Sequence, residues 1–173
     1  MTLPRLHGPR TTLLPVPYDV AAAVVAGDRQ RLLAALEALS ITPAAGWPHE
    51  DTPDALRPYA EHGGPDQDSG AWLLVVDSHV VGDLGWLGGP REDGDCELGY
   101  GLAAPSRNKG LGTEGVGVLA AWAERQPGVA RLTAEVLQGN DASRRLLLRL
   151  GFTPEPGTPP YVRFVRTAPT PTH

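Results

Sequence analysis

The segment Arg107–Gly115 (RNKGLGTEG) constrains the fold of this chain more than any other part of the sequence. Gly110 and Gly112 allow a backbone to come close to a ligand, and the apolar periodicity that follows predicts a helix. The first N–H groups of such a helix lack partners within it, and the helix dipole makes them suited to a diphosphate. Arg107 and Lys109 add positive charge. The segment is therefore predicted to be a phosphate-binding turn; the alternative is a glycine-rich loop that only begins a helix.

The same glycines also spell G-x-G-x-x-G, and Glu135 follows Gly115 by 20 residues, as the ribose-binding acid does in dinucleotide-binding proteins. The context argues against that interpretation. A polar connection separates the turn from the strand that ends at Leu102, and that strand closes an antiparallel meander instead of belonging to a parallel series. A nucleotide-binding oxidoreductase is thus a remote alternative, which would require that NAD binds and coenzyme A does not.

Periodicity and turn residues divide the chain into alternating strands and helices. Three consecutive strands read as an antiparallel meander, and a later strand–helix–strand unit reads as a crossover, which together predict an α/β fold with a mixed sheet. Strands are expected at Thr11–Pro17, Ala71–Val76, His79–Leu87, Cys96–Leu102, Val129–Leu137, after Phe152 and at Tyr161–Arg166, and helices after Asp19, after Asp28, at Pro53–His62, from Gly110 to about Gln126 and at Asn140–Leu150.

Composition excludes several classes of protein. The formal charge of −5 argues against binding to nucleic acid or to an anionic membrane, and no apolar run approaches the roughly 20 residues that span a bilayer. The single cysteine, Cys96, forms no intramolecular disulfide, and the histidines are scattered without metal-binding spacing, so no metal is expected. We expect a cytoplasmic protein.

One domain is expected over residues 1–173, with an ordered core at about 11–166 and loose tails at 1–10 and 167–173. Residues 41–68 are rich in Pro and Gly, which is typical of a lid or a substrate-facing region. Within that region Trp47 is the tryptophan expected to face substrate.

Two blocks of sequence carry a resemblance to a known family. The first is R-x-x-G-x-G at Arg107–Gly112, and the second is Asn140-Asp-Ala-Ser143 followed by Leu150-Gly151-Phe152. Their spacing and order resemble the GNAT superfamily of acyl-CoA N-acyltransferases over residues 96–152, and the element order extends the likeness over nearly the whole chain. E-L-G-Y-G-L at Glu97–Leu102 looks most like the RimJ/RimL branch, the N-terminal acetyltransferases of ribosomal proteins. The resemblance implies a mostly antiparallel sheet, flanked by helices and splayed between the family's fourth and fifth strands.

The resemblance also implies that the chain moves an acetyl group from acetyl-CoA to a primary amine, by direct transfer in a ternary complex. The acceptor would be a protein N-terminal α-amine or a small-molecule amine, and a homodimer is a state common among such proteins. By the same resemblance, the residues that bind coenzyme A are Leu98, Gly99, Tyr100, Gly101, Leu102, Arg107, Asn108, Lys109, Gly110, Leu111, Gly112, Thr113, Asn140 and Ser143.

Acetyl transfer requires a base that deprotonates the amine, and Glu97 is the favoured candidate. Backbone N–H groups at Gly99–Gly101 are candidates for stabilising the oxyanion. Many family members carry a tyrosine that protonates the thiolate, but Leu147 occupies that position here, so Ser143 is expected to act as the acid unless water does. This departure leaves open a catalytically weak or inactive acyl-CoA sensor. Lesser candidates for the base are Asp83, Asp95 and Glu135.

The acceptor is not named by any motif. A peptide acceptor predicts a groove that is open at both ends, whereas an antibiotic or polyamine predicts a closed pocket lined by acidic residues. His49-Glu50-Asp51 with Asp54 is a candidate for such an acidic lining.

Overall fold

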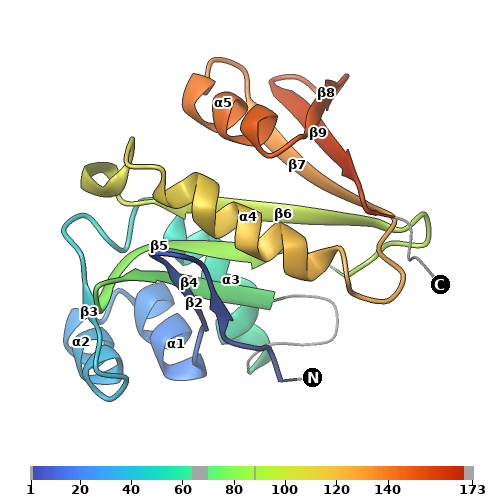
Figure 1. The fold of residues 1–173 in the computed structure, drawn as a ribbon. Coiled ribbons are helices and arrows are strands. Elements are labelled where there is room, and N and C mark those ends of the chain that lie inside the picture. Colours follow the sequence, from blue (N-terminus) through green and yellow to red (C-terminus); the bar gives the residue numbers. More distant parts are fainter. Residues whose placement is uncertain (1, 64–69, 88, 170–173) are drawn as a thin grey trace.

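The computed structural model describes residues 2–63, 70–87 and 89–169, and within them a nine-stranded sheet has helices on both faces (Figure 1). The strand order is β1-β2-β4-β5-β6-β7-β9-β8, and β3 pairs with β5 off this path. The strands are β1 Leu6–His7, β2 Thr12–Pro15, β3 Thr42–Pro43, β4 Gly70–Val76, β5 His79–Trp86, β6 Asp95–Leu102, β7 Arg131–Leu137, β8 Thr153–Glu155 and β9 Tyr161–Thr167. The helices are α1 Tyr18–Ala26, α2 Arg29–Glu37, α3 Thr52–His62, α4 Leu111–Ala123 and α5 Asp141–Arg149.

The predicted α/β fold with a mixed sheet is confirmed. Strands β4, β5 and β6 form the antiparallel meander, and β6 pairs in parallel with β7 after the crossover through α4. The hairpin between β4 and β5 turns at Asp77 and Ser78, which both have positive φ (47° and 63°), as a tight turn that matches the twist of the strands requires. Helix α2 begins after Asp28 as expected, because the Asp28 side chain accepts a hydrogen bond from the Arg31 N–H at 3.0 Å.

The first residues are ordered against the sheet, whereas the sequence predicted a loose lead-in. Strand β1 pairs with β2, and Leu3 is only 6% exposed within the main core. The indole Nε1 of Trp72 donates to the Pro4 carbonyl at 2.9 Å. Such a short edge strand has little local signal, because its order depends on partners distant in sequence. The tail predicted at 167–173 lies outside the described residues from 170 onward.

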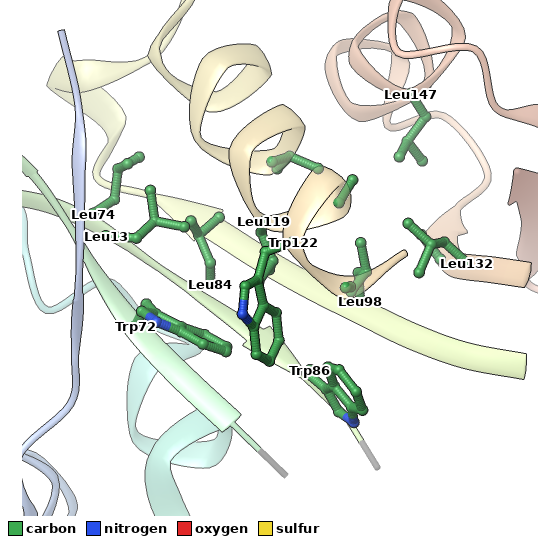
Figure 2. Packing of buried hydrophobic residues seen from close by; sticks show 14 of the residues in the cluster. Leu13, Trp72, Leu74, Leu84, Trp86, Leu98, Leu119, Trp122, Leu132 and Leu147 are labelled. Carbon is green, nitrogen blue, oxygen red and sulfur yellow. The ribbon is translucent and has the colours of Figure 1, made fainter. Parts of the chain in front are cut away.

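The main core fills the space between α4 and its face of the sheet. Figure 2 shows the Trp122 ring of α4 between Trp72 of β4 and Trp86 of β5, with ring centroids 5.1 and 5.2 Å from Trp122. Helices α1, α2 and α3 cover the opposite face and pack there around a second apolar cluster. None of the helices in the described ranges is long and apolar enough to cross a membrane.

Candidate active site

The glycine-rich turn begins α4 in the conformation that an anion-binding turn needs. Asn108 and Gly110 have positive φ (61° and 77°), and Gly110 is the N-cap of α4 without any side-chain capping bond. The N–H groups of the first helical turn are therefore not capped by a side chain and are available to a ligand. Arg107 Nε donates to the Leu102 carbonyl at 3.1 Å, which ties the guanidinium to the end of β6.

Gly112 also has a packing role in the structure, beside the close approach to a ligand that remains a prediction. A Cβ atom there would lie 3.1 Å from Leu146 Cδ1 and 3.3 Å from Leu102 Cδ1. The missing side chain thus makes room for leucines of α5 and β6. Gly112 sets how closely α4 packs against its neighbours.

The turn is attached to the N-terminal segment by Arg10. Its Nη1 donates to the Lys109 carbonyl at 3.1 Å, and its Nε and backbone N donate to the Glu114 carboxylate at 2.9 and 2.6 Å. Burial raises the pKa of Glu114, but the hydrogen bonds from Arg10 and Thr11 lower it by more, so its pKa lies below the usual value. Glu114 is therefore held as a carboxylate that fixes the start of α4.

Strands β6 and β7 separate beyond a short paired stretch, as the splay expected from the resemblance requires. Their pairing ends at Glu97 and Thr133. Beyond this point the backbone groups of β6 that face β7 have no ladder partner there. The gap holds a cavity of about 210 Å³ lined by Leu98, Gly99, Tyr100, Glu135, Val136, Leu137, Asn140, Ser143 and Tyr161.

Asp95 links the strands at the closed end of this gap. Its carboxylate accepts hydrogen bonds from Arg131 of β7 at 2.7 and 2.8 Å and a further one from Arg163 of β9. Burial raises the pKa of Asp95, but the two arginines lower it by more, so the pKa lies below its usual value. Asp95, a lesser candidate for the base, is therefore engaged in holding three strands together.

Tyr100 and Ser143 face each other across the gap. Within the described part of the chain, the buried Tyr100 hydroxyl has no hydrogen-bond partner of good geometry. Burial raises the pKa of Tyr100, against a smaller lowering by the nearby Ser143 hydroxyl. Asn140 caps α5 by accepting from the Ser143 N–H at 3.2 Å. The sequence prediction counted Tyr100 only among the cofactor-binding residues and missed that its hydroxyl lies near Ser143, whereas Leu147 is fully buried and does not line the gap.

A second cavity, of about 610 Å³, lies on the α3 side of β5 and β6. Its floor is glycine: Gly85 and Gly99 are direct cross-strand partners, and Gly101 pairs with Asp83. Gly99 and Tyr100 line this cavity and the gap beside β7 as well. Its lining consists of His49, Asp51, Asp54, Ala55, Leu56, Pro58, Tyr59, His62, Gly70, Ala71, Asp83, Leu84, Gly85, Trp86, Leu87, Gly99, Tyr100 and Gly101.

A buried polar cluster lies at one end of this second cavity. The Asp83 carboxylate accepts hydrogen bonds from Trp47 Nε1 and Thr52 Oγ1, both at 2.9 Å, and lies 3.0 Å from His49 Nε2. The His49 and Asp83 side chains are 9% and 6% exposed. The ring lies directly over Gly101, where a Cβ atom would come within 2.4 Å of it. Trp47, expected to face substrate, is instead buried (3% exposed) and orients Asp83.

The charge state of His49 follows from this cluster. Burial of the ring lowers the pKa of His49, but the contact with Asp83 and the charges of Asp83 and Asp51 raise it by more, so its pKa lies above the usual value. The sequence contained a signal for this site, because Gly99 and Gly101 share one face of a strand. It did not show that His49 lies over Gly101 and Leu87 over Gly99.

Glu97, the base favoured from the sequence, lies on the same face of β6 as Gly99 and Gly101 but lines neither cavity. Its carboxylate accepts from Arg91 Nη2 at 3.0 Å. Burial and the charge of Glu135 raise the pKa of Glu97 above its usual value, against the effects of Arg91 and Arg163. The structure therefore brings Glu135 and Ser143 to the gap and Asp83 to the second cavity, and leaves Glu97 beside Arg91.

Comparison with known proteins agrees with this geometry. A family model described as an acetyltransferase (GNAT) domain matches residues 10–153. YjdG of Bacillus subtilis (strain 168), described as an uncharacterized N-acetyltransferase, is 33% identical over 113 residues, which cover 61% of this chain and 66% of that protein. The match thus spans just under two thirds of that relative.

Two solved structures share the fold at low sequence identity. RimJ of Mycobacterium smegmatis, in complex with a CoA-disulfide, has a TM-score of 0.63 and 21% identity, covering 95% of this chain and 86% of that one. The microcin self-immunity acetyltransferase MccE, in complex with acetyl-CoA and AMP, has a TM-score of 0.65 and 15% identity, covering 92% and 93%.

Proposed function

Because this chain belongs to the GNAT acetyltransferase family, we propose that it transfers the acetyl group of acetyl-CoA to a primary amine by direct transfer in a ternary complex. One observation carries the proposal. One cavity lies in the gap between β6 and β7 and the other on the α3 side of β5 and β6, and Gly99 and Tyr100 line both. A donor in one cavity and an acceptor in the other would meet at those residues.

The residues around the turn and the gap fit coenzyme A. The uncapped N–H groups of Lys109–Thr113 and the charges of Arg107 and Lys109 suit its pyrophosphate. The unpaired edge of β6 offers backbone hydrogen bonds to its amide-containing arm, and the Tyr100 hydroxyl offers a buried polar atom without a partner. When bound there, acetyl-CoA supplies the acetyl group as a thioester.

The reaction forms an N–C bond and breaks a C–S bond, and the nitrogen of the ammonium loses two protons. The first goes to a base before attack and then to solvent, and the second leaves the nitrogen after the N–C bond has formed and reaches the departing sulfur. Two residues are proposed as the group that takes the ammonium proton: Glu97, from the sequence, and His49, from the structure. His49 is better supported, because its ring lines the cavity opposite the gap and is oriented by Asp83. Tyr100 and Ser143, which line the gap, are proposed to deliver the proton that the departing sulfur receives.

The acceptor is proposed to be a protein N-terminal α-amine or a small-molecule amine, and the protein is proposed to act in the cytoplasm, where acetyl-CoA is made and used. The alternative is an acyl-CoA sensor with weak or no activity. That alternative predicts coenzyme A binding without acetylation of any amine. An oxidoreductase would bind NAD in place of coenzyme A.

Calorimetric titration with acetyl-CoA tests the donor site, with NAD as the control ligand. We expect saturable micromolar binding that Ser143→Trp abolishes, because the indole would fill the gap beside Tyr100. Ala142→Trp is the matched control: Ala142 is exposed in the same helical turn and does not line the gap, so binding should persist. Failure of the wild type to bind acetyl-CoA would reject the proposal, and binding of NAD instead would favour the oxidoreductase.

A further inference from the structure

The second cavity exists because the sheet carries no side chains beneath it. Side chains at Gly85 and Gly99 would project from neighbouring positions of β5 and β6 into this space, and at Gly99 a Cβ atom would come within 2.9 Å of Leu87. The walls are mainly apolar and come from Leu87 and from Ala55, Leu56, Pro58 and Tyr59 of α3. The volume of about 610 Å³ lies in the range of sites that enclose a small molecule.

The acidic and basic side chains that line the cavity are three carboxylates and the histidines His49 and His62, and the Asp54 carboxylate is paired with Arg57 at 3.1 Å. Asp83 and His49 form the buried cluster, and Asp51 and Asp54 add carboxylates to the lining. His49 Nε2 is buried and, despite its 3.0 Å distance to Asp83, makes no aligned hydrogen bond within the described residues. This end of the cavity therefore favours a cationic group that can donate hydrogen bonds.

The apolar walls discriminate between the two kinds of acceptor. A peptide drawn into the cavity would bury amide groups against side chains that offer few hydrogen-bond partners, and each unpaired amide would oppose binding. A hydrocarbon chain or ring carries no such groups, and its binding improves with the apolar area that it buries. The walls thus suit an amine whose body is apolar, and the acidic end suits its ammonium.

We propose that this cavity binds a small primary amine on an apolar body, with the ammonium toward His49 and Asp83 and the body against α3 and the glycine floor. This inference rests on the proposed acetyl transfer and narrows its acceptor. It assigns the α3 face of β6 to the amine, opposite the coenzyme A gap. It also assigns the choice of acceptor to α3.

Acetylation of a homologous series of straight-chain amines, from butylamine to heptylamine, tests the proposal. We expect kcat/KM to rise about fourfold for each added CH₂ group until the cavity is filled. Amino alcohols of matched length and a tripeptide with an N-terminal alanine should be poorer acceptors by more than about tenfold. If kcat/KM did not rise with chain length, or if the tripeptide were the better acceptor, the assignment would be overturned.

Two variants of α3 test whether the preference for longer amines depends on the wall of this cavity. Ala55→Trp should lower kcat/KM for heptylamine by at least about tenfold and affect butylamine less, because the indole would occupy space beside α3 that a longer chain needs. Glu61→Trp is the matched control, since Glu61 is exposed on the same helix and lies outside the lining. Equal losses in both variants would contradict the proposal.

Titration with acetyl-CoA separates this inference from the function on which it rests. Both variants should bind acetyl-CoA as the wild type does. If the wild type binds acetyl-CoA and acetylates peptides but shows no gain along the amine series, the acceptor assignment fails and the acetyltransferase stands. If acetyl-CoA does not bind at all, the function and this inference fail together.

Discussion

At the scale of single residues, the site depends on His49 resting on a glycine. A Cβ atom at Gly101 would lie 2.4 Å from its Cε1 and 2.5 Å from its Nε2, so only glycine leaves the ring where Asp83 can orient it. Asp83 in turn is fixed by Trp47 and Thr52. The position of one histidine is thus determined by residues from a loop, a helix and two strands.

The pH dependence of catalysis is predicted from the raised pKa of His49. A base must be neutral, so kcat/KM for one chosen amine should rise through an ionisation above 6.5, the ordinary pKa of histidine. The pKa reflects burial, which lowers it, then Asp83 and Asp51, which raise it, and Arg107, which lowers it. His49→Gln should lower kcat by about 100-fold or more and remove this ionisation from the profile.

Glu97→Gln is the comparison for that profile. It should leave the ionisation in place if His49 is the base, and should remove it if the carboxylate is. Circular dichroism and the Kd of acetyl-CoA should be unchanged in both variants, which separates catalysis from folding. An unaltered profile in His49→Gln would exclude His49 as the base.

At the scale of elements, the start of α4 is supported from outside by the N-terminal segment. Arg10 bonds to the Lys109 carbonyl and to Glu114, and its Nη2 lies 3.2 Å from where a Cβ of Gly110 would be. The turn is therefore held open by a residue that is distant in sequence. A turn held in its binding conformation loses less entropy when a ligand binds.

Arg10→Ala is expected to weaken acetyl-CoA binding by about threefold to tenfold, because it removes the support and one positive charge near the turn. Isothermal calorimetry at fixed ionic strength measures this change. Arg5→Ala is the control, since Arg5 is an exposed arginine of the same segment. Equal Kd values for the two variants and the wild type would show that the attachment does not contribute to binding.

At the scale of the whole molecule, β6 joins two halves of the sheet and separates two cavities. Its first residues pair with β7, and its later residues pair with β5 while β7 turns away (Figure 1). Asp95 begins the stretch of β6 that pairs with β7, at the closed end of the gap, and bonds to Arg131 and Arg163. Its side chain is 2% exposed, so it is the buried carboxylate on which the closed end depends.

Asp95→Asn is expected to lower the free energy of unfolding by about 2 kcal/mol at pH 7, less than for a fully buried pair because the arginines are partly exposed. The folded pKa of Asp95 is depressed, so its contribution is present above the unfolded pKa of about 3.9 and is lost as pH falls through the folded pKa. Urea denaturation across this range should show the two proteins converging in acid. Asp19→Asn, which breaks an exposed pair with Arg31, should change stability by less than about 0.5 kcal/mol, and an equal effect of both variants would contradict this account.

Much of the fold was predictable because its signals are local. The hairpin at Asp77-Ser78, the turn at Arg107–Gly112 and the cap at Asn140 each depend on neighbours a few residues away, and all appear where expected. The docking of β1 and the pairing of β3 with β5 were not predicted. Each is a two-residue strand, too short for a periodic pattern.

The sequence by itself determined the family, the mixed sheet and the glycine-rich turn that begins α4, because glycine spacing, strand alternation and helix starts are properties of contiguous residues. Only the tertiary structure decided which side chains meet around the second cavity. His49 and Asp83 lie 34 residues apart in the chain and meet because the loop before α3 packs over β5. Tyr100 lines the gap because β7 turns away from β6. Such contacts depend on how whole elements pack in space, and no window of sequence contains that information.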